Sequence, residues 1–289
     1  MTRTKINLGT VGKPIKLDLE TCLYKMEQDM RYTRGSSDIH VLTSLGNARR
    51  LLTHYHVKEF SQEEARRLWR DMEARGLSRN TIRHYMLAYE EMARANGVPL
   101  KVDKPVRERR PADFLSAPEV RALIDSAGNV RDRAILSVLA YCGVRNGELC
   151  RLDTGDIDWI NRMMIIRKAK NKRPRQVVIK RECMAALEAW IKIRPDLKTT
   201  ALFMNKYGAR LTKDRLCIIV REAGRRAGIE RRVHPHMLRH TCGTRMIGTG
   251  MSTRDTADQL GFSSLAMLDV YVHNDSRELR EKIDKMFYY

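Results

Sequence analysis

The chain has 289 residues, with 55 lysines and arginines against 35 aspartates and glutamates, which gives a formal net charge of +20. This length suffices for two domains of ordinary size, and the charge favours a polyanionic partner, nucleic acid ahead of an anionic membrane surface. No apolar run approaches the roughly 18 residues of a spanning helix, and the N-terminus lacks the apolar centre of a signal peptide, so we expect a soluble, cytoplasmic protein.

The six cysteines are scattered singly, without a CxxC pair or the Cys/His spacing of a zinc site. We expect them to be reduced and mostly buried. Aromatic residues make up only 6% of the chain and no internal repeat is visible, which argues against solenoids and against single-strand binders that stack bases.

The first hundred residues predict an all-helical domain over residues 14–98. Apolar residues recur at helical spacing from Asp18 to Met30 and from Asp38 to about Tyr55. The capping box Ser61-Gln-Glu-Glu64 opens a third predicted helix, in which the glutamate reaches back to the serine backbone. A fourth helix runs from about Asn80 to the break at Gly97-Val98-Pro99.

Residues 99–114 are rich in proline and basic residues and show no periodicity. We interpret this segment as an interdomain linker that crosses the DNA backbone, with a solvated loop as the alternative. Its predicted DNA contacts are Lys104, Arg107, Arg109 and Arg110.

A second predicted domain covers residues 115–289 and opens with another capping box, Ser116-Ala-Pro-Glu119. The apolar run from Arg131 to Cys142 predicts a buried helix that ends at Gly143. After Arg181 the pattern is again helical.

Two short β-prone runs, Met163–Ile166 and Gln176–Ile179, lie between these helices and predict an antiparallel hairpin with a basic tip. The expected fold class is therefore mainly α with a small antiparallel β-sheet. Taken alone, the basic residues of the tip would be solvated charge.

The segment His236-Met-Leu-Arg239-His240 follows Pro235, which favours a helix start. Residues i and i+3 share a helix face, so His236 and Arg239 can reach one target together. A histidine that titrates near neutrality beside a guanidinium suits proton transfer at a phosphate. Taken alone, a histidine on the surface or with a satisfied place in the core is the more common explanation.

Arg145 follows a glycine break at the end of the apolar helix, with Glu148 three residues further on. Taken alone, this spacing favours a structural salt bridge.

Three segments in chain order resemble the conserved boxes of the tyrosine recombinase (phage integrase) family. RDRAILSVLAYCGVRNGELCRLDTGDID, residues 131–158, resembles the first box, an apolar helix followed by T-G-L-R-x-x-E-L. HPHMLRHTCGTRMIGTG, residues 234–250, resembles the second, built on H-x-L-R-H-T, and QLGFSSLAMLDVYVH, residues 259–273, resembles the terminal L-G-H-x₈-Y-x-H segment. The helix over residues 77–97 resembles the last long helix of the family's core-binding domain.

The resemblance implies a role for each matching residue. Arg145 and Arg239 would clamp the non-bridging oxygens of the scissile phosphate, a task that suits the paired donors of guanidinium. Tyr271 would be the nucleophile that forms a 3′-phosphotyrosine, and His236 would handle its proton or help to hold the phosphate. The rival tyrosines, Tyr288 and Tyr289, lie outside the motif.

The family's remaining catalytic group is a lysine in the hairpin turn, which protonates the departing 5′-oxygen. Alignment of Arg175-Gln-Val-Val-Ile with the family's R-x-V-P-L places Lys170 there, with Lys168 and Lys172 as alternatives. Lys168, Lys172 and Arg173 are also predicted DNA contacts. Because the phosphotyrosine conserves the energy of the broken phosphodiester, no ATP, metal or other cofactor is expected.

Phe262 is a departure from the family pattern, which has His or sometimes Trp after Leu-Gly. Phenylalanine cannot donate a hydrogen bond to a phosphate oxygen. Either packing alone supports the active site at this position, or the enzyme is impaired there.

The resemblance implies a helical core-binding domain and an α+β catalytic domain that form a clamp around DNA. Four protomers would act on two specific DNA sites through a Holliday junction, with a C-terminal helix docked on a neighbour or on its own domain and with possible accessory DNA-bending or directionality proteins. We expect a nucleoid-associated, Xer-like recombinase or a small integrase, because no arm-binding domain precedes the helical unit. Integration, excision and dimer resolution stay open, and the alternatives are a type IB topoisomerase and a catalytically impaired DNA-binding or architectural relative.

Overall fold

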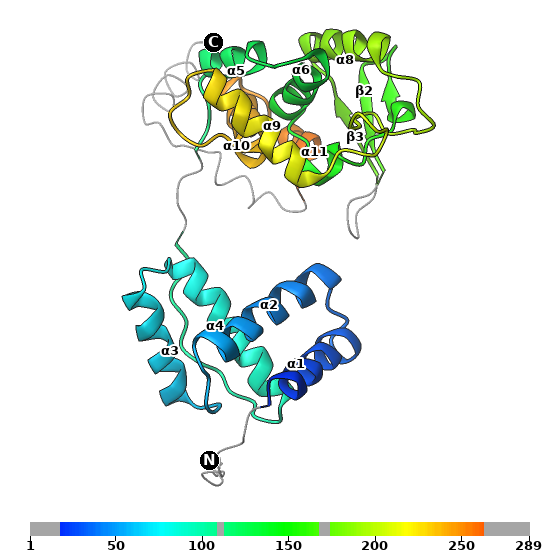
Figure 1. The fold of residues 1–289 in the computed structure, drawn as a ribbon. Coiled ribbons are helices and arrows are strands. Elements are labelled where there is room, and N and C mark those ends of the chain that lie inside the picture. The colour runs from blue at the N-terminus through cyan, green and yellow to red at the C-terminus, as the bar shows by residue number, and fades with distance from the viewer. Residues whose placement is uncertain (1–17, 109–112, 168–173, 263–289) are drawn as a thin grey trace, which may run out of the picture. The chain divides into compact units, whose positions relative to one another are not determined.

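The computed structural model describes residues 18–108, 113–167 and 174–262. The chain divides into two compact units, residues 1–110 (unit 1) and residues 111–289 (unit 2). Each unit is described by itself below (Figure 1).

All the secondary structure described in unit 1 is helical, and its last helix, α4 (Arg79–Ala95), lies at the centre. This helix contacts each of the other three, and the buried side chains of all four form one apolar cluster. Tyr89 lies at the centre of the cluster, fully buried, and its hydroxyl donates to the carbonyl of Glu59, 2.8 Å away. The elements are α1 (Leu19–Gln28), the π-helical turn η1 (Asp29–Thr33), α2 (Asp38–His54), α3 (Gln62–Ala74) and α4 (Arg79–Ala95).

The capping box predicted at the start of α3 forms only by half. Ser61 Oγ accepts from the backbone N–H of Glu64 at 3.1 Å, as expected. The carboxylate of Glu64, however, accepts from the backbone N–H of Lys58 and pairs with Arg67, while the N–H of Ser61 donates to the hydroxyl of Tyr89. The prediction for Glu64 was wrong because Lys58 and Arg67 bind its carboxylate, and the hydroxyl of Tyr89 accepts from the N–H of Ser61 in its place.

The basic segment after α4 packs along that helix as far as residue 108. Val102 is buried in the apolar cluster of unit 1, and its N–H donates to Glu90 Oε1 at 2.7 Å. The ammonium group of Lys104 pairs with the same carboxylate, and the carbonyl of Pro105 accepts from Arg83. Tertiary contacts thus extend about ten residues beyond the helix.

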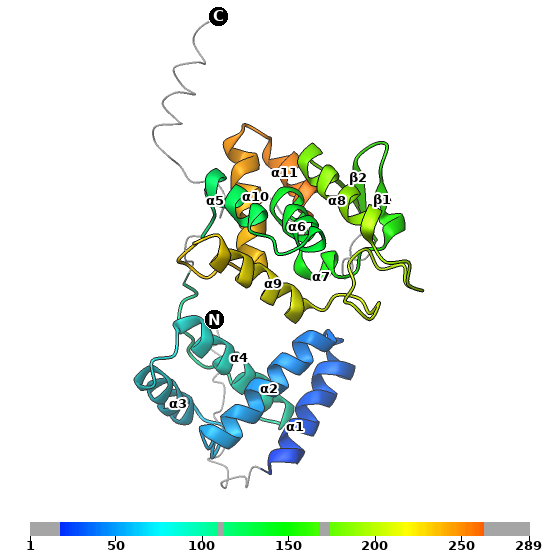
Figure 2. The same cartoon turned by 45° about the horizontal axis from the view of Figure 1, so that its top comes forward.

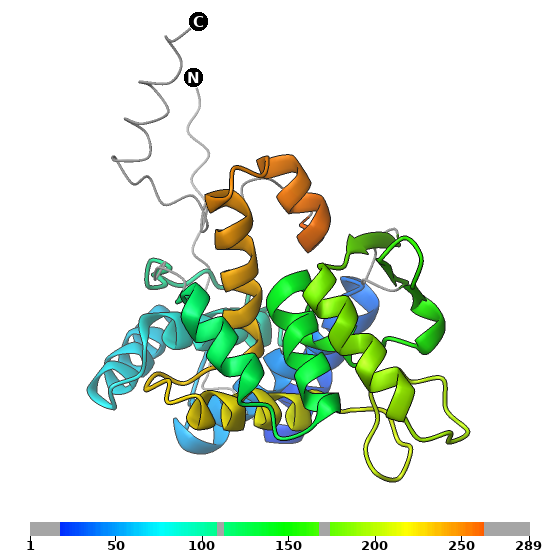
Figure 3. The ribbon, with the colours of Figure 1, turned by 90° about the horizontal axis from the view of Figure 1, so that it is seen from above.

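Unit 2 is built around one buried helical segment, α6 (Val130–Ser137) continued by the π-helical turn η2 (Val138–Cys142). Figures 1 and 2 show α6 at the centre, with α8 (Arg181–Ile193) on one side and α5 (Ala117–Asp125) and α10 (Pro235–Gly248) on the other. In Figure 3, seen from above, α6 again lies between α5 and α8. The segment ends at Gly143, as predicted, with the left-handed φ of +63° that glycine adopts freely.

The helix that was predicted to open at Ser116 is α5. The capping box at Ser116 is complete, since the serine and Glu119 each accept from the other's backbone N–H. Two short helices, α7 (Asn146–Leu149) and α11 (Thr253–Leu260), position residues of the site described below. The remaining helix in the described part of unit 2 is α9 (Lys213–Arg226).

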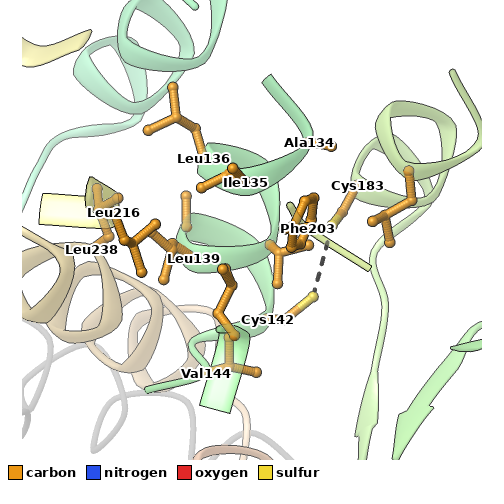
Figure 4. Close-up of a cluster of buried hydrophobic side chains, with 14 of the residues drawn as sticks. Ala134, Ile135, Leu136, Leu139, Cys142, Val144, Cys183, Phe203, Leu216 and Leu238 are labelled. Carbon is orange, nitrogen blue, oxygen red and sulfur yellow. Dashed lines mark hydrogen bonds between the residues drawn. The ribbon is translucent and has the colours of Figure 1, made fainter. Parts of the chain in front are cut away.

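The buried core of unit 2 gathers around α6 and η2. Figure 4 shows Ile135 and Leu139 from this segment, and Val144 just after it, packed with Leu216 and Leu238 from neighbouring helices. The thiols of Cys142 and Cys183 lie 3.8 Å apart in the same core (dashed in Figure 4). All six cysteines fall in the described residues and are free, five of them buried and Cys217 exposed, as expected.

The sheet has three antiparallel strands in the order β1–β2–β3, namely Ile157–Asp158, Met163–Ile166 and Arg175–Val178. The predicted hairpin is β2–β3, with β3 one residue earlier than expected, and β1 is an additional short strand. The fold class predicted from the sequence is confirmed. No helix among the described residues is long and apolar enough to cross a membrane.

Candidate active site

Arg145 is the residue immediately before α7, and its guanidinium makes two ordered contacts. One Nη donates to Glu148 Oε1 at 2.9 Å, and the other donates to the carbonyl of Gly261 at 2.9 Å. Gly261 is the residue after the last turn of α11, where helix carbonyls have no partner within the helix. About 30% of the Arg145 side chain is exposed, so the guanidinium can still reach an external anion.

Glu148 is a buried carboxylate shared between two arginines. Besides Arg145, it accepts from both terminal nitrogens of Arg175, at 2.9 and 2.8 Å. Burial alone would raise the pKa of this carboxyl group, but the hydrogen bonds from Arg175 and from the Arg145 backbone, the charge of Arg175 and the side-chain hydrogen bond from Arg145 lower its pKa to about 2. Glu148 is therefore ionised throughout the physiological range, and its charge holds Arg145.

Arg239 lies on α10 and is buried, with 4% of its surface exposed. Its two terminal nitrogens donate to the carbonyls of Gly143 and Leu260. Leu260 and Gly261 are consecutive, so Arg239 and Arg145 bind adjacent peptide carbonyls at the end of α11. Two guanidinium groups from distant parts of the chain are thereby held at one point.

Gly143 allows this approach because a side chain would not fit. A Cβ atom at Gly143 would lie 2.4 Å from Leu260 Cδ2 and 3.0 Å from Cys242 Sγ. The glycine that ends the apolar helix thus also sets the distance between η2, α10 and α11.

His236 lies in the first turn of α10 and is exposed to solvent. Partial burial of its ring and the positive charges of Arg239, His234 and Arg145 lower its pKa. The imidazole is therefore neutral near pH 7 and can accept a proton. His240, one turn further on, has its ring centroid 6.5 Å from that of His236, and burial together with the nearby positive charge of Arg239 lowers its pKa too.

Phe262 is the next residue after Leu260 and Gly261, and its ring packs against Arg239. The Cζ atom of Arg239 lies 4.8 Å from the centroid of its ring, in cation–π contact. The ring also packs against the small apolar cluster of Cys242, Ala257 and Leu260. Phenylalanine at this position therefore supports Arg239 by contact.

The sequence brought forward three residues that the structure gathers at this point, Arg145, His236 and Arg239, with Phe262 beside them. The carboxylate of Asp156 is buried; it accepts a hydrogen bond from the backbone N–H of Asp153 and pairs with Arg167. Lys104 and Arg107 belong to unit 1, and Arg107 is exposed. The remaining predicted site residues lie outside the described residues; they are Tyr271, Lys170, Lys168, Lys172, Arg173, Arg109 and Arg110.

Sequence reasoning missed four contributors. In the sequence, Arg175 served only to align the hairpin with the family pattern. Gly143 served only as the end of a helix, and Gly261 only as part of the terminal motif. His234 begins α10, because its Nδ1 accepts from the N–H of Met237 at 3.1 Å. In the described part of the chain, no group of three or more His, Cys, Asp or Glu side chains is placed to hold a metal ion.

The comparisons with known proteins agree with this geometry. Residues 113–278, more than half of the chain, match the Phage integrase family. The chain belongs to this family of tyrosine recombinases. Tyrosine recombinase XerC of Haemophilus ducreyi is 34% identical over 163 residues, which are 56% of this chain but only 53% of that protein. Tyrosine recombinase XerD of Mycobacterium tuberculosis is 33% identical over 213 residues, 68% of each chain.

Solved structures of tyrosine recombinases share the fold. The XerH site-specific recombinase bound to a palindromic difH substrate matches with a TM-score of 0.74 at 18% identity, over 94% of this chain and 97% of that one. The family expected from the three sequence boxes is confirmed.

Proposed function

We propose that this tyrosine recombinase cuts and rejoins duplex DNA at specific sites through a 3′-phosphotyrosine intermediate at Tyr271. The observation that carries the proposal is the pair of guanidinium groups, Arg145 and Arg239, bound to adjacent carbonyls beside a neutral His236. Two fixed cations and one proton acceptor suit a phosphodiester whose charge grows in the transition state. The DNA-bound state of the similar XerH structure supports duplex DNA as the partner.

The chemistry proceeds by exchange of one phosphate ester for another. The oxygen of Tyr271 attacks phosphorus and its proton passes to His236, while the bond from phosphorus to the 5′-oxygen breaks and that oxygen takes a proton from Lys170. Arg145 and Arg239 stabilise the non-bridging oxygens, and loss of either guanidinium costs about 3–4 kcal/mol of transition-state stabilisation. Rejoining reverses these steps with a new 5′-hydroxyl, so the bond energy is retained.

The broader arrangement is part of the same proposal. Four protomers act on two DNA sites through a Holliday junction, and accessory proteins set the direction of the exchange. The backbone contacts come from the basic segment after α4 and from the hairpin. These residues are Lys104, Arg107, Arg109, Arg110, Lys168, Lys172 and Arg173.

The experiment begins by mapping the DNA that the purified protein binds and placing that site in a nicked duplex, from which the cut strand diffuses away. We expect a covalent protein–DNA adduct that Tyr271→Phe abolishes. Tyr288→Phe and Tyr289→Phe are matched controls and should leave the adduct intact.

The outcomes separate the alternative functions. Absence of an adduct on every bound site would contradict the proposal and favour a DNA-binding or architectural protein. Relaxation of supercoiled plasmid without a second site, and no strand exchange with one, would favour a type IB topoisomerase.

A further inference from the structure

Arg175 is the first residue of β3, and its side chain is largely enclosed. It is 15% exposed, against 64% for Arg167, the residue that follows β2. Both terminal nitrogens bind the two oxygens of Glu148, a planar two-point contact that lysine cannot make. Both terminal nitrogens of the Arg175 guanidinium are therefore bound to one carboxylate.

That carboxylate is the one that orients Arg145. Glu148 Oε1 accepts from Arg145 at 2.9 Å and from Arg175 at 2.9 Å, and Oε2 accepts from the Arg145 backbone N–H at 2.9 Å. With both oxygens bound by Arg175, the carboxylate has one orientation. The direction in which it presents Oε1 to Arg145 is thereby fixed.

The guanidinium of Arg175 also packs against the end of α11. A Cβ atom on Gly261 would lie 2.6 Å from Arg175 Cζ, so the glycine backbone rests directly on the guanidinium. The side chain of Gln259 joins the two elements a second time, since it accepts from the N–H of Val178 and donates to its carbonyl, both at 2.9 Å. Arg175 thus bears on both partners of Arg145, the carboxylate of Glu148 and the carbonyl of Gly261.

We propose that Arg175 is a positioning residue for DNA cleavage, which sets the orientation of Arg145 through Glu148 and Gly261. This inference rests on the proposed recombinase activity. Both terminal nitrogens of Arg175 donate to Glu148, so Arg175 is not proposed to contact the phosphate directly. Its removal should disturb the angle of Arg145 and leave the positive charge of Arg145 in place.

The consequence for the reaction follows from geometry. Without Arg175, Glu148 loses the two hydrogen bonds that hold it from the side of the hairpin, and its carboxylate keeps only the two bonds from Arg145 itself, one from the backbone N–H and one from the side chain. A displacement of about 1 Å at a catalytic group costs on the order of 100-fold in rate. Binding of DNA, which depends on many charges, should change little.

The test compares Arg175→Met and Arg175→Lys with Arg167→Met, a matched control at the residue after β2, whose partner is Asp156. The nicked duplex of the preceding section gives a single-turnover cleavage rate and, separately, a dissociation constant. We expect Arg175→Met to slow cleavage by about 10- to 100-fold, with a smaller loss for Arg175→Lys, and both to keep the dissociation constant. Arg167→Met should cleave at the wild-type rate.

A double-mutant cycle distinguishes positioning from general weakening of the fold. In an Arg145→Lys background, Arg175→Met should slow cleavage by less than about threefold, because its effect passes through Arg145. A full additional loss in that background would overturn the proposal. So would a folded Arg175→Met variant that cleaves at the wild-type rate; if the methionine variant does not fold, Arg175→Lys decides by the same criterion.

A second readout is independent of catalysis. In protein labelled with ¹⁵N-arginine, the terminal nitrogens of Arg145 should give separate, slowly exchanging signals in the wild type and averaged signals in Arg175→Met. Unchanged signals would overturn the positioning role. If the wild type forms no adduct, this readout still decides the role of Arg175, and the failure lies with the proposed function alone.

Discussion

Phe262 acquires a definite role at the residue scale. Its sequence position suggested either support by packing or an impaired site, and the ring is found 4.8 Å from the guanidinium carbon of Arg239. A ring in this position stabilises the positive charge of the guanidinium. The contact favours support by packing.

We predict that Phe262→Ala slows cleavage of the nicked duplex about 5- to 30-fold, since a cation–π contact between a half-buried ring and a buried guanidinium is worth about 1–2 kcal/mol. Tyr207→Ala is a suitable control, because Tyr207 contacts Lys206 in the same manner but is 78% exposed. Phe262→His should cleave within about threefold of the wild type. A large gain in the histidine variant would show that phenylalanine impairs the enzyme.

Glu148 provides a prediction for stability against pH. Its pKa in the folded protein is about 2, below the ordinary value of 4.5, so the stabilisation is present above pH 4.5 and disappears as the pH falls towards 2. Glu148→Gln should lower the free energy of unfolding at pH 7 by about 3 kcal/mol, and this difference should shrink in acid.

Urea unfolding at a series of pH values measures this difference. Glu188→Gln, an exposed position on α8, is the control and should differ little from the wild type at any pH. A Glu148→Gln deficit that stays constant from pH 7 to pH 3 would contradict the linkage.

At the scale of elements, local signals fixed most helix ends and tertiary packing fixed the rest. Ser116 and Gly143 begin and end helices where their chemistry predicts, and β2 occupies its predicted residues. The π-helical turns η1 and η2 were not foreseen, because the choice between helix types depends on packing that single-residue propensities do not contain.

Some residues of the site could likewise be predicted from local sequence, and others could not. Arg145, His236 and Arg239 belong to short motifs that can be read locally, whereas Arg175 and Glu148 are 27 residues apart and meet only through the hairpin. No spacing rule links a strand residue to a helix residue at that separation. The contact between Gly143 and α11 is of the same kind.

Gly143 allows a test at this scale. Gly143→Ala combines an unfavourable φ with a Cβ that would lie 2.4 Å from Leu260, so we expect a loss of about 2–4 kcal/mol in the free energy of unfolding. Thermal unfolding followed by circular dichroism measures it. Gly155→Ala, where nothing lies within 4 Å of the added Cβ, should be nearly neutral. Equal melting temperatures for the two variants would refute the steric argument.

At the scale of the whole molecule, each unit has its own buried cluster, and the segment between them belongs in part to unit 1. Prolines and charge predicted a linker from residue 99, yet Val102 is buried and Lys104 is paired. Composition does not show that one valine within a basic stretch meets an apolar site on α4. The partition of the chain into two units falls between Arg110 and Pro111.

We therefore predict that a fragment of residues 14–108 is more stable than a fragment of residues 14–98. Burial of Val102 and its hydrogen bond to Glu90 should together contribute about 2–3 kcal/mol. Urea unfolding of the two fragments gives the difference. Val106→Ala in the longer fragment is a control, because Val106 is 80% exposed. Identical unfolding midpoints for the two fragments would show that the segment adds nothing to unit 1.

The arginines of the site are anchored largely on main-chain oxygens, those of Gly143, Leu260 and Gly261. A carbonyl group is the same whatever side chain its residue carries, so most substitutions around these arginines leave the anchors unchanged. Evolutionary drift can therefore alter much of the surrounding sequence while the spacing of the two cations persists. It is constrained mainly where a side chain would move the backbone itself, at the two glycines.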